Sequence, residues 1–118
     1  MDQQFKGRLI LVVEDQPLVA LDIKQSLIEA GALVLTAATL QEGLRLAKNL
    51  ELAAAILGLA LGSEDAEPLC ARLSARGIPF VVYSGYSELP SDCRAGVIIS
   101  KPATPTTLLG ALAHMLLP

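Results

Sequence analysis

Four short aliphatic segments of this chain end at positions that could together form one reactive site. Glu14 and Asp15 follow the first of them, Gly58 ends the next, and Ser84 and Lys101 follow the last two. Carboxylate oxygens are the ligands that Mg²⁺ prefers, and a hydroxyl or an ammonium group can hold a phosphate. If the segments are neighbouring strands, the residues share one pocket, and Gly58 contributes no side chain to it.

Each of these residues also has an ordinary interpretation. Two adjacent carboxylates could form a solvated turn or lie at a helix N-terminus, where the helix dipole favours anions. Ser84 followed by glycine is typical of a turn. Lys101 could be a solvated charge, although Pro102 restricts the backbone of the residue before it. The order and spacing of the set are therefore more informative than any member of it.

The segments that position these residues alternate with amphipathic stretches. Continuous aliphatic runs predict strands buried on both faces, at residues 8–14, 32–37, 53–57, 78–83 and 97–100. Apolar residues at helical spacing predict helices at residues 17–31, 39–49, 66–77 and 104–117, with Thr39 and Glu42 as a capping box. Alternating strands and helices predict one α/β domain over residues 1–118, a doubly wound parallel sheet with helices on both faces and its site at the carboxyl ends of the strands.

The connection over residues 84–96 is the hardest part to interpret. It contains Pro90 and two glycines, which exclude a long helix. We expect one short helix at residues 91–94, so that the fourth helix of the series is short or irregular.

Composition excludes several classes of protein. The net charge is −3 and the nine basic residues are scattered, which argues against a nucleic-acid partner. No apolar run approaches the ~20 residues of a membrane span, so no membrane association is expected. Two cysteines, Cys70 and Cys93, are too few for a disulfide framework. We expect both to be reduced and the chain to be cytoplasmic.

The combined motifs resemble the receiver domain of two-component signalling, the CheY-like phospho-acceptor module of bacterial response regulators. The resemblance spans residues 9–117 and rests on four segments: 9–17 (LILVVEDQP), 57–62 (LGLALG), 79–86 (PFVVYSGY) and 99–102 (ISKP). It implies a flavodoxin-like sheet with strand order 2-1-3-4-5. Some receivers of this kind are stand-alone proteins, and others end sensor kinases.

The resemblance also implies roles for the pocket residues. Glu14 and Asp15 match the acidic pair that holds Mg²⁺, whereas Ser84 and Lys101 match the residues that contact the phosphoryl group. Gly58 falls at the phospho-accepting aspartate, and glycine removes the carboxylate nucleophile that phosphoryl transfer requires. Mg²⁺ binding is then possible but weak, and Lys101 could pair with Asp15 instead.

A second departure from the family concerns the switch residue, an aromatic side chain whose rotation is coupled to phosphorylation in receivers. Receivers usually carry Tyr or Phe three residues before the lysine, and here that position is Ile98. Phe80 and Tyr83 lie on the preceding strand and do not replace it by register. The switch therefore looks altered together with the acceptor.

These features favour a pseudo-receiver, a binding module and not an enzyme. Its partner would be a sensor histidine kinase or another signalling protein, or a second copy in a homodimer. The candidate interaction face is on the last helix and consists of Leu108, Leu109, Leu112 and Leu116, with Leu117 beside them. Equally, a small sheet could need a helix with a wide apolar face, and these leucines would then be buried.

The alternative is a phosphorylatable receiver. Its acceptor aspartate would have been replaced by mutation at Gly58, or another residue would accept the phosphate. Glu64 and Asp65 are the nearest acids after Gly58, but they lie six and seven positions further on, and no ordinary loop would direct them back. His114, the only histidine, is expected to be an ordinary residue near a helix C-terminus.

Overall fold

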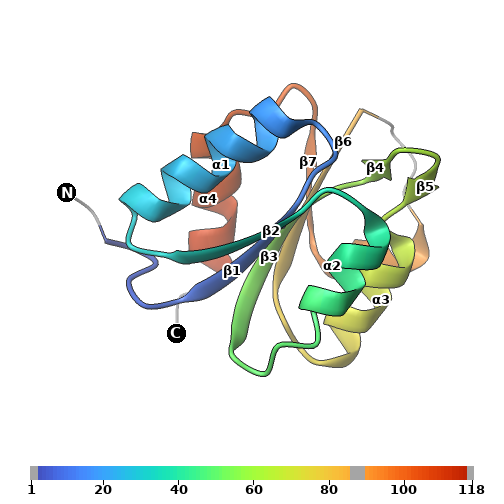
Figure 1. Cartoon of the computed structure of the whole chain (residues 1–118), viewed down its shortest axis with the longest axis horizontal. Helices are drawn as coiled ribbons and strands as arrows, with labels where there is room; N and C mark the ends of the chain where they lie inside the picture. The colour runs from blue at the N-terminus through green and yellow to red at the C-terminus, as the bar shows by residue number, and fades with distance from the viewer. Residues whose placement is uncertain (1–2, 86–89, 117–118) are drawn as a thin grey trace.

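A five-stranded parallel sheet forms the centre of the computed structural model, which describes residues 3–85 and 90–116 (Figure 1). Its order is β2-β1-β3-β6-β7, which confirms the predicted order 2-1-3-4-5 of the five main strands. The strands are β1 (Leu9–Val13), β2 (Leu33–Ala37), β3 (Leu52–Gly58), β6 (Phe80–Ser84) and β7 (Val97–Ser100).

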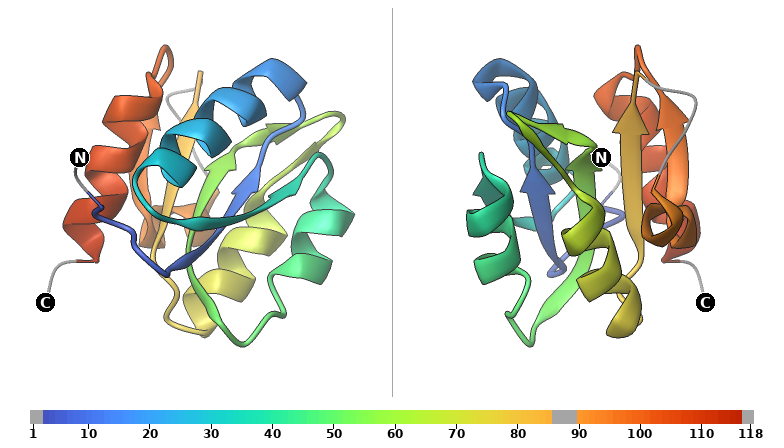
Figure 2. Two further views of the ribbon diagram at one scale, coloured as in Figure 1. Left: turned by 60° about the vertical axis from the view of Figure 1, so that its left-hand side comes forward. Right: turned by 90° about the vertical axis from the view of Figure 1, so that its right-hand side faces the viewer.

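Helices cover both faces of this sheet (Figure 2). On one face α1 (Pro17–Glu29) and α4 (Pro105–Met115) pack on a core around Ile10, Ile56 and Val81. On the other face α2 (Leu40–Leu46) and α3 (Glu67–Ala75) pack on a second core. Because adjacent strand residues point to opposite faces, the aliphatic runs supply both cores at once. Within the described residues, no helix is both long and apolar enough to cross a bilayer.

The predicted helix starts at Thr39 and Thr104 are both present. The Thr39 hydroxyl accepts the backbone N–H of Glu42 at 3.1 Å, and that of Thr104 accepts the N–H of Thr107 at 3.2 Å. The predicted capping box is only half formed, because the Glu42 carboxylate pairs with Arg45 at 3.4 Å. An exposed arginine one turn along the helix is a better partner for this carboxylate than the neutral N–H of the cap.

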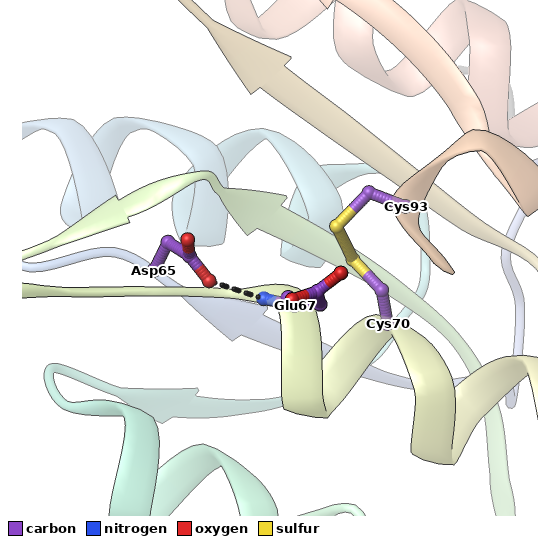
Figure 3. The surroundings of a disulfide bond; sticks show 4 residues. All are labelled: Asp65, Glu67, Cys70 and Cys93. Atoms are coloured by element: carbon purple, nitrogen blue, oxygen red, sulfur yellow. Dashed lines mark hydrogen bonds between the residues drawn. A yellow bond between two sulfur atoms is a disulfide. The ribbon is translucent and has the colours of Figure 1, made fainter. Parts of the chain in front are cut away.

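A small hairpin that the sequence did not predict follows β3. It consists of β4 (Ala60–Leu61) and β5 (Glu64–Asp65), joined through Gly62 with a φ of 67°. Asp65 accepts the N–H of Glu67 at 2.9 Å and so satisfies a free donor at the start of α3 (Figure 3). Glu64 and Asp65 are therefore exposed hairpin residues, and the Asp65 carboxylate is already hydrogen-bonded to the first turn of α3.

The expectation of two reduced cysteines is wrong in this structure. Cys70 of α3 and Cys93 of η1 (Ser91–Ala95), a 3₁₀ helix at the predicted short-helix position, form a disulfide (Figure 3). Their Cα atoms are 5.0 Å apart, which is within the normal range for a disulfide. η1 packs against α3, and both cysteines are fully buried. A count of cysteines could not reveal this proximity, because 23 positions separate the two residues.

Candidate functional site

The strand ends that were predicted to converge do so. Gly58 of β3 pairs with Tyr83 of β6, and Ser84 pairs with Ser100 of β7, immediately before Lys101. β1 lies on the other side of β3, so that Glu14 and Asp15 emerge beside Gly58. The backbone N–H of Lys101 donates to the carbonyl of Ser84 at 2.9 Å, which extends the pairing past the end of β7.

Glu14 is a buried carboxylate with both oxygens engaged. Its side chain is 3% exposed. One oxygen accepts the hydroxyl of Tyr83, and the other accepts the backbone N–H of Gln16 at 2.9 Å. Burying a carboxylate costs less free energy when hydrogen bonds replace its hydration. Glu14 is therefore held in place by β6 and by the first turn of α1.

Asp15 is exposed and attached to the hairpin. Its carboxylate accepts the backbone N–H of Gly62 at 3.0 Å. The pKa of Asp15 is below its usual value, chiefly through a side-chain hydrogen bond with Glu14 and then through the Gly62 N–H. The positive charge of Lys101 makes only a minor contribution to this shift. In the described residues the ion pair within 4.0 Å is Arg45–Glu42, so the suggested pairing of Lys101 with Asp15 is not observed.

Gly58 is buried, and a side chain at this position would begin in close contact with Glu14 and Tyr83. A Cβ atom added there would lie 3.1 Å from the Glu14 carboxylate oxygen and 3.5 Å from the Cζ and hydroxyl oxygen of Tyr83. The first distance is shorter than an ordinary van der Waals contact. The pocket therefore has little room for a side chain at residue 58.

Tyr83 is the site residue that the sequence reasoning missed. It is 3% exposed, and its ring lies 5.4 Å from Nζ of Lys101. Burial raises the pKa of Tyr83 far above its usual value, and the hydrogen bond and charge of Glu14 raise it further. A buried tyrosine usually needs a partner for its hydroxyl. A tyrosine hydroxyl inside an otherwise apolar run, residues 80–83, was therefore the available signal.

The remaining predicted residues have different environments. Ser84 is buried, whereas Lys101 is exposed and joined to Pro102 by a cis peptide bond. Ile98 lies on β7 and is 41% exposed, so this aliphatic side chain faces partly into solvent. A pocket of about 420 Å³ lies beside the site, lined by Glu14, Gln16, Val19, Tyr83, Lys101, Pro102 and Ala103.

The proposed face on the last helix needs correction. Leu108 and Leu112 are at most 1% exposed, because they pack against the sheet from α4. Leu109 and Leu116 are only partly buried, and Leu117 is outside the described residues. The more exposed large apolar residues of the helices lie instead on α1, where the exposed fractions are 77% for Leu18, 46% for Leu21 and 51% for Ile28.

The donor set fits a magnesium ion only incompletely. Asp15 is accessible, but Glu14 is buried with both oxygens in hydrogen bonds, and Gly58 supplies no carboxylate. Across residues 3–85 and 90–116, no three His, Cys, Asp or Glu side chains are grouped as metal ligands. Mg²⁺ gives up its water reluctantly and usually needs one or two free carboxylates.

The raised pKa of Tyr83 predicts a loss of stability in alkali. Above about pH 10 the unfolded chain releases the phenol proton while the folded chain keeps it. The free energy of unfolding should then fall by about 1.4 kcal/mol per pH unit. Denaturant unfolding between about pH 9 and pH 11 measures this slope. Tyr83→Phe is the control and should show a smaller slope; equal slopes for both proteins would contradict the buried, protonated phenol.

The sheet order β2-β1-β3-β6-β7 is that of a flavodoxin-like α/β fold, with the acidic pair and the Lys-Pro pair at the carboxyl ends of its strands. No family model matches the sequence, and neither does any curated protein. Solved structures do match. A CheY-like response regulator receiver domain from Methanospirillum hungatei is 28% identical, with a TM-score of 0.80 over 92% of this chain and 93% of that one.

Two further structures share the fold. The receiver domain of a sensor histidine kinase from Pseudomonas aeruginosa, with magnesium in its active-site cleft, is 24% identical, with a TM-score of 0.75 over 92% of this chain and 96% of that one. A chain of the CheX–CheY complex from Borrelia burgdorferi is 18% identical, with a TM-score of 0.82 over 96% and 92%. The chain thus has the flavodoxin-like α/β fold of CheY-like receiver domains.

Proposed function

We propose that this chain is a pseudo-receiver, which keeps the receiver fold but does not accept a phosphoryl group at residue 58. The observation that carries the proposal is the environment of Gly58. This residue supplies no nucleophile, and the side chains of Glu14 and Tyr83 lie 3.1 and 3.5 Å from where its Cβ would be. Phosphoryl transfer needs a carboxylate that is free to approach the phosphorus atom in line with the leaving group.

Other residues are poorly placed to replace the acceptor. Glu64 and Asp65 are exposed on the β4–β5 hairpin, and Asp65 already caps α3. Ser84 is a buried hydroxyl, and a serine nucleophile needs a neighbouring base. Glu14 is the nearest carboxylate to Gly58, but its two oxygens already accept hydrogen bonds from Tyr83 and Gln16. Mg²⁺ then binds weakly, through Asp15.

The chain then acts by contact with another protein and not as an enzyme. A sensor kinase, another signalling protein or a second copy of the chain is the class of partner that a receiver fold suits. The exposed side chains of Leu18, Leu21 and Ile28 on α1 form the better candidate surface, because Leu108 and Leu112 belong to the core. Sedimentation across micromolar concentrations distinguishes self-association from binding to another protein. If the chain is a monomer at every concentration, its partner is a different protein.

Incubation with acetyl phosphate and Mg²⁺, followed by intact mass measurement, tests the proposed function. We expect no gain of a phosphoryl group, because residue 58 has no nucleophile. A receiver domain with an intact acceptor, treated in parallel, shows that the donor is active. A phosphoryl group gained by the wild-type chain would contradict the proposal, and peptide mapping would then identify the alternative acceptor.

A further inference from the structure

The pocket at residue 58 is filled from one side by a tyrosine. Gly58 and Tyr83 are direct neighbours on β3 and β6 in the parallel register. The hydroxyl of Tyr83 reaches the same Glu14 oxygen that a Cβ at residue 58 would meet at 3.1 Å. A side chain at residue 58 would therefore meet both of these side chains at its first atom, and the Glu14 carboxylate would have to shift to admit it.

Several contacts hold this arrangement in place. Tyr83 and Glu14 are each 3% exposed, and the N–H of Gln16 fixes the second oxygen of Glu14. On its outer side the tyrosine ring lies 5.4 Å from the Lys101 ammonium, within the range of a cation–π contact. A buried hydrogen bond to a charged group is stronger than a neutral one, and breaking it would leave one of the two Glu14 oxygens without its donor.

We propose that Tyr83 is a positioning residue that closes the pocket at residue 58 by engaging Glu14. The pocket has then been rebuilt at two positions, and a carboxylate restored at residue 58 is not enough to reopen it. This inference rests on the proposed function and adds the residue that enforces it. A purely structural tyrosine would also fill the core, but its removal would not make an aspartate at residue 58 more reactive toward a phosphoryl donor.

The test compares Gly58→Asp alone with Gly58→Asp combined with Tyr83→Leu. Each protein is incubated with acetyl phosphate and Mg²⁺. In a reactive variant the introduced carboxylate oxygen attacks phosphorus, and the bond from phosphorus to the acetate oxygen breaks. Intact mass should show at least about tenfold faster phosphorylation of the double variant. Mg²⁺ should raise the melting temperature of the double variant more than that of the single variant.

A matched control excludes a general loosening of β6. Gly58→Asp combined with Phe80→Leu makes the same aromatic-to-leucine change on the same strand. Phe80 packs in the opposite core, with Leu69 and Leu73, and leaves the Tyr83–Glu14 contact intact. This control should behave like the single Gly58→Asp variant. If the Tyr83→Leu double variant does not fold, Tyr83→Phe with Gly58→Asp replaces it, because it removes only the hydroxyl.

Two results would overturn the inference. One is a single Gly58→Asp variant that is phosphorylated as fast as the double variant, which would mean that Tyr83 does not close the pocket. The other is a folded double variant that takes up neither Mg²⁺ nor phosphate, because the obstacle would then lie elsewhere. Neither result bears on the proposed function, which fails only if the wild-type chain itself gains a phosphoryl group.

Discussion

Gly96→Ala should destabilise this protein by about 3 kcal/mol or more, at the upper end of the cost of overpacking a core. Gly96 ends η1 and leads into β7. A Cβ at this position would lie 2.5 Å from the carbonyl oxygen of Phe80 and 2.5 Å from an atom of its ring. The carbonyl belongs to a strand with neighbours on both sides, so it cannot move without disturbing β3 or β7.

Thermal and denaturant unfolding of the Gly96→Ala variant measure this loss, which should lower the melting temperature by about 10 °C or more. Gly110→Ala is the matched control. Gly110 lies within α4, where an added Cβ meets nothing within 4 Å. Alanine should stabilise that helix by about 0.5–1 kcal/mol. If the Gly96→Ala variant is as stable as the wild type, the close approach of Gly96 to Phe80 is wrong.

Removal of the disulfide should cost a similar amount. The bond between Cys70 and Cys93 closes a loop across 23 positions and fastens η1 to α3. A cross-link of this span restricts the unfolded chain, and the corresponding stabilisation is about 3 kcal/mol. Reduction should therefore lower the urea midpoint of the wild-type protein, since the folded contacts stay but the unfolded chain gains freedom.

The control for this experiment is the Cys70→Ala, Cys93→Ala double variant, whose urea midpoint should not respond to reductant. An unchanged midpoint in the wild type would show that the cysteines are not joined. Disulfides are rare in reducing compartments, so this pair and the predicted cytoplasmic location make opposite demands on the redox environment. Rapid alkylation of the protein in cells would show which state Cys70 and Cys93 have there.

The sequence predicted the sheet well because its strands have a simple local signature. Residues 9–13 and 52–58 are buried on both faces, and only continuous aliphatic runs satisfy such positions. The two-residue strands β4 and β5 are too short for any periodicity, and they depend on Gly62 and the N–H that it donates to Asp15. Local patterns could therefore predict the main sheet but not the hairpin beside the site.

The site was harder to predict because its decisive contacts join distant residues. Glu14 and Tyr83 are 69 positions apart, and only the register of β6 against β3 places Tyr83 beside Gly58. The leucines of α4 show the same difficulty. Leu108 and Leu112 face the sheet while Leu109 and Leu116 lie toward its side, a division that depends on how the helix is rotated. The roles assigned to Glu14, Asp15, Ser84, Lys101 and Ile98 by resemblance stay predictions.

The contact between Tyr83 and Glu14 also gives the protein an intrinsic optical probe. The chain has two tyrosines and no tryptophan, so its ultraviolet fluorescence comes from tyrosine alone. An excited phenol that donates to a carboxylate is quenched, because the excited state readily transfers its proton. Tyr83 should therefore emit little light in the folded protein. Any partner or ligand that separates this phenol from Glu14 would be detected as an increase in emission, without a label.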